Sequence, residues 1–123
     1  MVTASTTPAT LPETRAVPRE APAEGLVCRR CGALVTTETA RIVRRDAHRH
    51  TRINPHGYVF ELGCFSDAPG AVASGEPTLE FTWFEGLAWR MADCRGCSAH
   101  LGWHYQGQGD EFWGLVLDRL SRA

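Results

Sequence analysis

The sequence predicts an all-β domain of antiparallel strands, held together by one four-cysteine zinc site. Three observations support this prediction. Two Cys-x-x-Cys pairs lie far apart in the chain, and short strand-like runs alternate with turn signals. No window of about 11–18 residues sustains a helical period, so helix is expected for at most a turn or two.

Residues 1–24 differ in composition from the rest of the chain. They hold four of the seven prolines, five threonines and five alanines, but no Gly, Cys, Phe, Trp or Tyr. Such a segment cannot bury enough apolar surface to order itself, so we expect a disordered tail. The folding domain is then residues 25–123, a modest size that a metal site would help to stabilise.

The composition argues against several classes of function. Thirteen Arg and no Lys stand against 14 acidic residues, so the net charge is −1, unlike that of a general nucleic-acid binder. The lack of Lys also excludes a catalytic lysine. There is no run of about 18 apolar residues and no secretory signal at the start. We expect a cytoplasmic monomer with reduced thiols and with neither nucleic-acid nor membrane partners.

Four of the five cysteines form two matched pairs, and the candidate zinc ligands are Cys28, Cys31, Cys94 and Cys97. Two residues between thiolates allow a tight turn to aim both sulfurs at one ion. Glycines at positions 32 and 96 supply permissive backbone for such turns. We expect a closed structural zinc site that joins the two ends of the domain. Two redox dithiols or two disulfides are the alternative.

Strand-like runs follow one another at hairpin spacing. The predicted strands are residues 34–37, 41–44, 49–53, 58–65, 79–84, 87–92, 101–105 and 111–117. The Asn54-Pro55-His56-Gly57 segment is a strong turn signal, and residues 67–77, with two Gly and two Pro, are expected to form a loop. Glu85-Gly86 is a predicted turn within a tight hairpin. Alternation places Tyr58, Phe60, Leu62 and Cys64 on one face of their strand.

The fifth cysteine and the histidines have ordinary interpretations beside functional ones. Cys64 lies in the middle of a predicted strand, which favours a small buried side chain over a reactive thiol. His48 and His50 could bind a metal, but a solvated loop is the simpler interpretation. His100 follows the second cysteine pair and could donate a hydrogen bond to a zinc thiolate. The sequence has no recognisable Ser/His/Asp spacing, phosphate loop or His-Glu-x-x-His motif.

Four tryptophans in the last 41 residues are the most informative side chains. Trp83 and Trp89 flank the predicted hairpin and can point to the same side. Trp103 and Tyr105 share a face of the following strand. These rings could form a cage for a flat ring or an organic cation. They could equally be the core of a small β-domain, and spacing alone leaves both interpretations open.

Several motifs together resemble the cereblon thalidomide-binding domain family, also called the CULT domain. The matching segments are Cys28-x-x-Cys31-Gly32, Asn54-Pro-His-Gly-Tyr-Val59, Phe81-Thr-Trp-Phe-x-Gly-x-x-Trp89, Cys94-x-x-Cys97, His100-Leu-Gly-Trp103 and Phe112-Trp-Gly-Leu115. They occur in the family's order and cover about residues 26–120. The resemblance implies a β-tent, in which two antiparallel sheets meet at an angle and are pinned by one zinc.

The resemblance also implies a ligand and a set of ligand-binding residues. Family members bind cyclic imides, notably glutarimide, in a pocket of three tryptophans, which the motifs match to Trp83, Trp89 and Trp103. Tyr105 takes the place of a fourth wall. The backbone around Phe81 matches the segment that bonds the imide edge. Asn54 and Pro55 match the loop at the pocket mouth, and Trp113 matches a position that we expect to be structural.

Two departures from the family pattern limit what the resemblance implies. Animal members carry His at the position of Phe81, so we expect weaker or differently tuned binding here. The Lon-like and helical regions of cereblon are not recognisable in this sequence, so we expect a stand-alone, bacterial protein without a ubiquitin-ligase role.

Three functions remain in competition. The first is a binding module for cyclic imides, for uracil-like rings or for imides at the C-termini of peptides. The second is a protein-interaction adaptor. The third is an enzyme of the methionine sulfoxide reductase kind, a family that shares the broad fold, with Cys64 as the nucleophile. That chemistry usually needs a resolving cysteine, and the other four are assigned to zinc. We therefore favour the binding module, with no catalytic residue.

Overall fold

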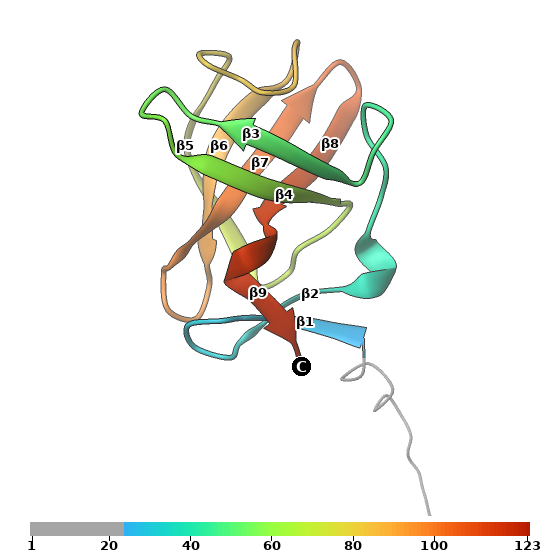
Figure 1. Ribbon diagram of the computed structural model, residues 1–123, viewed down its shortest axis with the longest axis vertical. Helices are drawn as coiled ribbons and strands as arrows, with labels where there is room; N and C mark the ends of the chain where they lie inside the picture. Colours follow the sequence, from blue (N-terminus) through green and yellow to red (C-terminus); the bar gives the residue numbers. More distant parts are fainter. Residues whose placement is uncertain (1–23) are drawn as a thin grey trace, which may run out of the picture.

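The computed structural model describes residues 24–123, which form two antiparallel sheets (Figure 1). The smaller sheet has the order β2-β1-β9, with β1 at Gly25–Cys28, β2 at Leu34–Thr37 and β9 at Leu120–Arg122. The larger sheet has the order β3-β4-β8-β7-β6-β5. Its strands are β3 (Arg49–Ile53), β4 (Val59–Phe65), β5 (Ala71–Thr78), β6 (Ala88–Cys94), β7 (His100–Gly107) and β8 (Asp110–Val116). The predicted all-β, two-sheet architecture is therefore confirmed.

Within residues 24–123, the other regular elements are two short 3-10 turns. They are η2 (Glu38–Ala40) and η3 (Leu117–Arg119), and η3 leads directly from the larger sheet into β9 of the smaller one. The predicted tail, residues 1–24, lies outside the described residues except for Glu24. No helix among residues 24–123 is long and apolar enough to cross a membrane.

The larger sheet curls strongly, so that β3 and β4 lie in front of β6 and β7 (Figure 1). This curl brings Phe60 of β4 to Trp103 of β7, with ring centroids 5.3 Å apart, although β8 separates the two strands in the sheet. A Cβ at Gly102 would lie 2.2 Å from the Gly114 carbonyl oxygen, so glycine permits the close approach of β7 and β8 just before Trp103.

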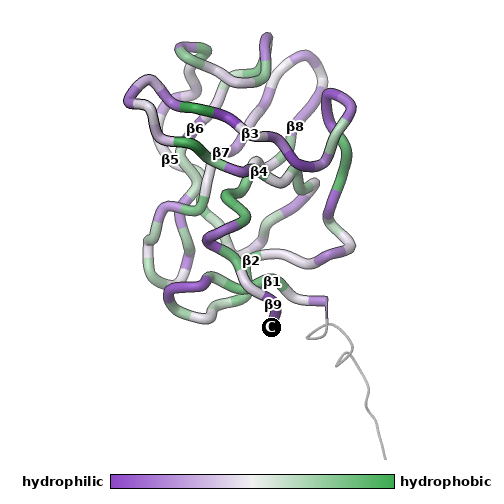
Figure 2. Tube along the Cα trace, viewed as in Figure 1, coloured by the Kyte–Doolittle hydropathy of each residue, from purple (hydrophilic) through white to green (hydrophobic). Residues whose placement is uncertain are grey.

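Two clusters of buried apolar side chains fill the interior. One contains residues of both sheets, including Leu26, Val35, Phe65, Leu101 and Leu120, and it includes two of the paired cysteines. The other lies within the curl of the larger sheet and includes Leu62, Phe84, Tyr105 and Phe112. Figure 2 shows hydrophilic stretches in β3 and in several loops, and hydrophobic stretches within β4. Trp83 and Trp89 are partly buried and pack against this second cluster, which therefore holds the two tryptophan side chains in place.

Several local predictions are wrong, and each has a physical reason. Residues 71–78, all but the last of which lie in the predicted loop 67–77, form edge strand β5. The irregularity between Ser74 and Thr78 accommodates Gly75 and Pro77. Residues 79–84 form a loop instead of a strand, in which the Thr82 hydroxyl donates to the Leu87 carbonyl (2.7 Å). The hairpin proposed between Trp83 and Trp89 is therefore absent.

Two further predictions of local structure need correction. Residues 41–44 make only isolated bridges instead of a strand. His50 is buried, although we expected a solvated loop, and its Nε2 lies 2.9 Å from the Arg44 carbonyl oxygen. Its ring also packs against Phe84 with centroids 5.1 Å apart. His50 therefore anchors the 41–47 segment over the core.

Candidate functional site

The four paired cysteines converge at one point in the structure. The sulfur atoms of Cys28, Cys31, Cys94 and Cys97 all lie within 4.8 Å of one another. The Cys28 and Cys97 sulfurs are 3.7 Å apart, and so are those of Cys31 and Cys94. A disulfide needs about 2.05 Å, so neither pair is bonded. Four sulfurs at ~2.3 Å from a tetrahedral zinc would stand ~3.8 Å apart, so the cluster has the spacing to hold one such ion.

Backbone N–H groups stabilise thiolates at this cluster. The Ala33 N–H donates to Cys31 Sγ (3.4 Å), and the Gly96 N–H donates to Cys94 Sγ (3.3 Å). Burial opposes ionisation of Cys94, but the N–H groups of Cys97 and Gly96 outweigh it and help to lower the pKa of this thiol to about 7. At Cys31 the Ala33 N–H also favours the thiolate, but burial and the three neighbouring cysteines raise the pKa of this thiol to about 11. Metal ligation requires thiolates, and the backbone N–H groups favour it most at Cys94.

The cysteine cluster connects the two sheets. Cys28 ends β1 of the smaller sheet, and Cys94 ends β6 of the larger one. Both side chains are buried in the cluster of apolar side chains that the sheets share. A metal ion bound here would therefore link the two layers of the fold, in the manner of a structural site.

All seven predicted ligand-binding residues line one cavity of about 710 Å³. They are Asn54, Pro55, Phe81, Trp83, Trp89, Trp103 and Tyr105. Sequence reasoning did not assign four further lining residues, His56, Phe60, Met91 and His100. Phe60 had a detectable signal, because alternation already placed it on the face of Leu62 and Cys64. His56 and His100 lie within matched motifs, which could have indicated them, whereas Met91 gave no signal.

The tryptophans come from different elements and are held by different contacts. Trp83, in the loop between β5 and β6, donates its indole N–H to the Ile53 carbonyl (3.2 Å). Trp89, on β6, donates to the Glu80 carbonyl (2.8 Å). Trp103, on β7, stands edge-on to Trp83 with centroids 4.9 Å apart and an interplanar angle of 79°. These contacts fix the orientation of three aromatic walls.

Tyr105 and the β3–β4 turn complete the cavity. Tyr105 is fully buried between Phe84 and Phe112, and burial raises the pKa of its phenol, so the phenol stays neutral. The Asn54 side-chain oxygen accepts the N–H groups of His56 and Tyr58, both at 2.9 Å. Asn54 therefore shapes the turn at the cavity mouth by its own side-chain bonds.

The loop that carries Phe81 has an unusual backbone. Phe81 has a φ of 58°, a left-handed conformation that is uncommon for a residue with a bulky side chain. Its ring is 68% exposed, at the edge of the cavity. No hydrogen bond within residues 24–123 uses the Phe81 carbonyl or the Trp83 N–H. Among the described residues, this backbone therefore offers one acceptor and one donor that have no protein partner.

His100 does not donate to the cysteine cluster, which corrects our sequence interpretation. Its Nε2 lies 2.9 Å from the Gly102 carbonyl oxygen, and its Nδ1 faces Arg119. Burial lowers the pKa of this imidazole, so the neutral form is favoured. Trp113 packs against His104 with ring centroids 4.6 Å apart and an interplanar angle of 60°, and it does not line the cavity.

Cys64 is poorly placed for chemistry. Its side chain is fully buried, it does not line the cavity, and burial raises the pKa of its thiol to about 11. We expect Cys64→Ala to leave glutarimide affinity within about twofold and to cost ~1–2 kcal/mol of unfolding free energy. Thermal melts and fluorescence titrations would measure both. A large loss of affinity in a folded Cys64→Ala chain would place the thiol in the site.

Three curated relatives of this chain are cereblon proteins. No family model matches the chain. Over 73 residues, or 55% of the chain, the sequence is 38% identical to protein cereblon of Gallus gallus. It is 38% identical over 74 residues, or 56% of the chain, to protein cereblon of Xenopus tropicalis. It is also 39% identical over 57 residues, or 43% of the chain, to protein cereblon of Drosophila melanogaster.

About half of this chain is similar to cereblon. The matched regions cover 16%, 17% and 9% of the chicken, frog and fly proteins, respectively, so the chain corresponds to a small part of each. The similarity supports a cereblon-like domain, in agreement with the family resemblance of the motifs.

Proposed function

We propose that this cereblon-like domain binds neutral, flat cyclic imides in its aromatic cavity. The observation that carries the proposal is the convergence of all seven residues that the family resemblance assigns to ligand binding on one cavity of about 710 Å³. Cavities of this size suit small organic ligands, which are usually held by aromatic walls and a few polar groups. Glutarimide is the simplest probe of this class, and uracil-like rings or C-terminal imides of peptides are natural relatives of it.

The polar edge of an imide has complementary partners in the loop between β5 and β6. An imide presents one N–H donor between two carbonyl acceptors. The Phe81 carbonyl would accept the ring N–H, and the Trp83 N–H would donate to a ring carbonyl. Both groups lack partners within residues 24–123. Because the two protein groups belong to the backbone, replacement of the family's His by Phe81 removes a side-chain bond but preserves these two.

We further propose that the metal is one structural zinc ion. Four thiolates with tetrahedral spacing are the donor set that zinc prefers, and a closed set leaves no position for substrate. Cys28, Cys31, Cys94 and Cys97 would hold it. When bound, the ion supplies a link between the sheets and takes no part in ligand recognition.

The burial of Cys64 favours a binding module over an enzyme of the sulfoxide-reductase kind. A nucleophilic thiol needs access to substrate and a useful fraction of thiolate, and a fully buried thiol with a pKa of about 11 has neither. The alternative of a protein-interaction adaptor remains compatible with ligand binding. Exposed apolar side chains at Phe81 and Ile53 lie beside the cavity.

Titration of the full chain with glutarimide, followed by tryptophan fluorescence, tests the proposal. We expect saturable binding that Trp83→Ala weakens at least about tenfold, because this residue forms a wall of the cavity and lies in a loop, outside the strands. Trp113→Phe is the matched control, because it removes an indole that does not line the cavity. Absence of saturable binding, or an equal loss in both variants, would contradict the proposal.

A further inference from the structure

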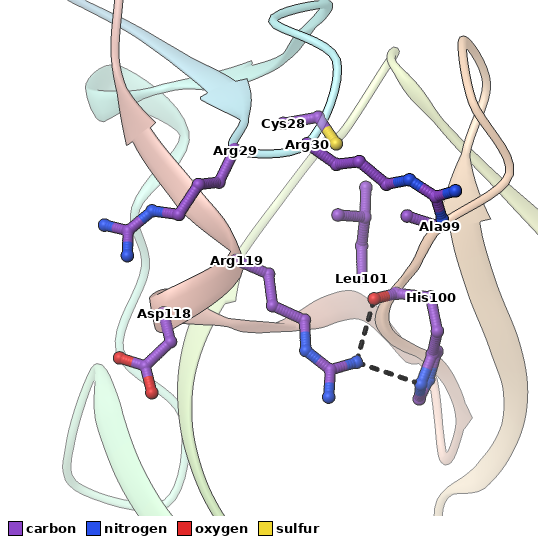
Figure 3. Close-up of a pocket in the computed structure, with 8 residues that line it drawn as sticks. All are labelled: Cys28, Arg29, Arg30, Ala99, His100, Leu101, Asp118 and Arg119. Atoms are coloured by element: carbon purple, nitrogen blue, oxygen red, sulfur yellow. Dashed lines mark hydrogen bonds between the residues drawn. The ribbon is translucent and has the colours of Figure 1, made fainter.

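Arg119 lines a hollow of about 370 Å³ that is separate from the aromatic cavity and next to the cysteine cluster. Figure 3 shows its side chain directed from η3 toward His100, whereas Arg29 and Arg30 extend in other directions. Arg119 does not line the aromatic cavity, but His100 lines both the hollow and the cavity. This shared residue connects the two spaces.

The guanidinium of Arg119 fixes both the position and the tautomer of His100. Its Nη1 donates to the His100 carbonyl (2.9 Å) and lies 3.2 Å from His100 Nδ1 (Figure 3). Arginine offers only donors, so Nδ1 must accept this contact. The proton of the neutral ring then resides on Nε2, which donates to the Gly102 carbonyl (2.9 Å). Contacts at both ring nitrogens therefore hold the imidazole in one orientation.

Arg119 also contacts a second wall of the cavity. Its Cζ lies 5.7 Å from the centre of the Phe60 ring, within the range of a cation–π contact. Phe60 and His100 both stand edge-on to Trp103, with centroid distances of 5.3 and 4.9 Å and interplanar angles of 79° and 86°. One guanidinium therefore supports Phe60 and His100, two of the three side chains that pack edge-on against Trp103, the third being Trp83.

The backbone of Arg119 connects this arrangement to the cysteine cluster. Its carbonyl accepts the N–H of Arg29, in the turn between Cys28 and Cys31, at 2.9 Å. The side chain thus extends toward the cavity from a point that is bonded to the first cysteine turn. The bond between the Arg29 N–H and the Arg119 carbonyl and the bond between the Arg119 guanidinium and the His100 carbonyl both lie outside the regular hydrogen-bond pattern of the sheets.

From these contacts we infer that Arg119 is a positioning residue for the aromatic cavity. It holds His100 and Phe60, and through them Trp103, in the orientation that binds ligand. This role rests on the proposed function for its effect on affinity, but it also makes a prediction that needs no ligand. The indole of Trp103 should change its surroundings when the guanidinium is removed.

The test compares Arg119→Gln with the control Arg29→Gln. Arg29 lines the same hollow and carries the same charge, but its side chain has no hydrogen-bond partner within residues 24–123. Arg119→Gln should shift the Trp103 indole Nε1–H resonance in ¹H–¹⁵N spectra and weaken glutarimide binding about three- to tenfold. Arg29→Gln should do neither. Zinc content should stay at one ion per chain in both variants. Arg119→Lys keeps the positive charge but loses the planar guanidinium with its several N–H donors. Its affinity for glutarimide should therefore lie between that of the unmodified chain and that of Arg119→Gln.

A double-mutant cycle separates positioning from general loss of stability. If Arg119 acts through His100, the effects of Arg119→Gln and His100→Gln on affinity should be strongly non-additive, whereas Arg119→Gln and Trp113→Phe should add. An unchanged Trp103 resonance together with unchanged affinity in Arg119→Gln would overturn the inference. So would additive effects with His100→Gln. Failure of the unmodified chain to bind glutarimide would reject the proposed function, and the Trp103 resonance would still decide the role of Arg119.

Discussion

Removal of the proposed zinc ion is expected to unfold the domain rather than only to weaken ligand binding. The strands of the smaller sheet have three or four residues each, so they have few hydrogen bonds of their own. Apparent binding free energies of structural zinc sites are ~10–16 kcal/mol, comparable to or larger than the ~5–15 kcal/mol that stabilises an ordinary domain. Chelation, or Cys94→Ser, should therefore abolish the cooperative thermal transition.

Cys64→Ala is the matched control for this experiment, because it removes a thiol that lies outside the cluster. It should keep one zinc per chain and lower the melting temperature by only a few degrees. Calorimetry and a colorimetric assay of released zinc would report both quantities. A metal-free chain that still melted cooperatively and bound glutarimide would show that the four cysteines are not structural.

The cysteine spacing and the strand pattern allowed much of this architecture to be predicted. Two matched pairs with two intervening residues specify how the sulfurs converge, because local turn geometry determines the positions of both members of each pair. The strand at Arg49–Ile53 was predicted with the observed bounds, because a strong turn signal follows it directly. The two-sheet arrangement itself came from the family resemblance, since periodicity does not reveal how strands are distributed between sheets.

The failures concern features that depend on tertiary contacts. β5 is an edge strand with mostly exposed residues, so it has little apolar alternation to detect, and its Gly75 and Pro77 resemble loop signals. Short β9 obtains its order from pairing with β1, a contact between the two ends of the described chain. The contacts of Arg119 likewise depend on how η3 meets β7. A local pattern contains none of this information.

For the site, motif matching predicted seven of the eleven lining residues, whereas spacing alone left the tryptophans divided between core and cage. The structure shows why both interpretations had merit. Trp103 is 9% exposed and belongs to the buried cluster, yet it also lines the cavity. A ring at such a boundary has a core-like sequence environment, so sequence alone does not separate the two roles.

The cavity is expected to prefer a neutral imide over charged ligands of similar size. None of the eleven lining residues is Arg or Lys, so a buried carboxylate would lack a permanently charged partner, and burying a charge without such a partner is costly. The ring-opened acid of glutarimide has that carboxylate and additional rotatable bonds that binding must immobilise. Tetramethylammonium is the strongest rival, because each indole face attracts a cation by ~0.5–2 kcal/mol. It cannot, however, bond to the Phe81 carbonyl or the Trp83 N–H.

We therefore expect glutarimide to bind at least about tenfold more tightly than either the ring-opened acid or tetramethylammonium, a difference of ~1.4 kcal/mol. N-methylglutarimide separates charge from hydrogen bonding, because it is neutral and nearly flat but lacks the ring N–H. It should lose much of the affinity if the Phe81 carbonyl accepts that proton, and the loss should persist in Trp113→Phe. Fluorescence titration of the four compounds under one buffer condition would measure the order. Equal or tighter binding of tetramethylammonium would assign the cavity to cation recognition, and undiminished binding of N-methylglutarimide would exclude the backbone contact at Phe81.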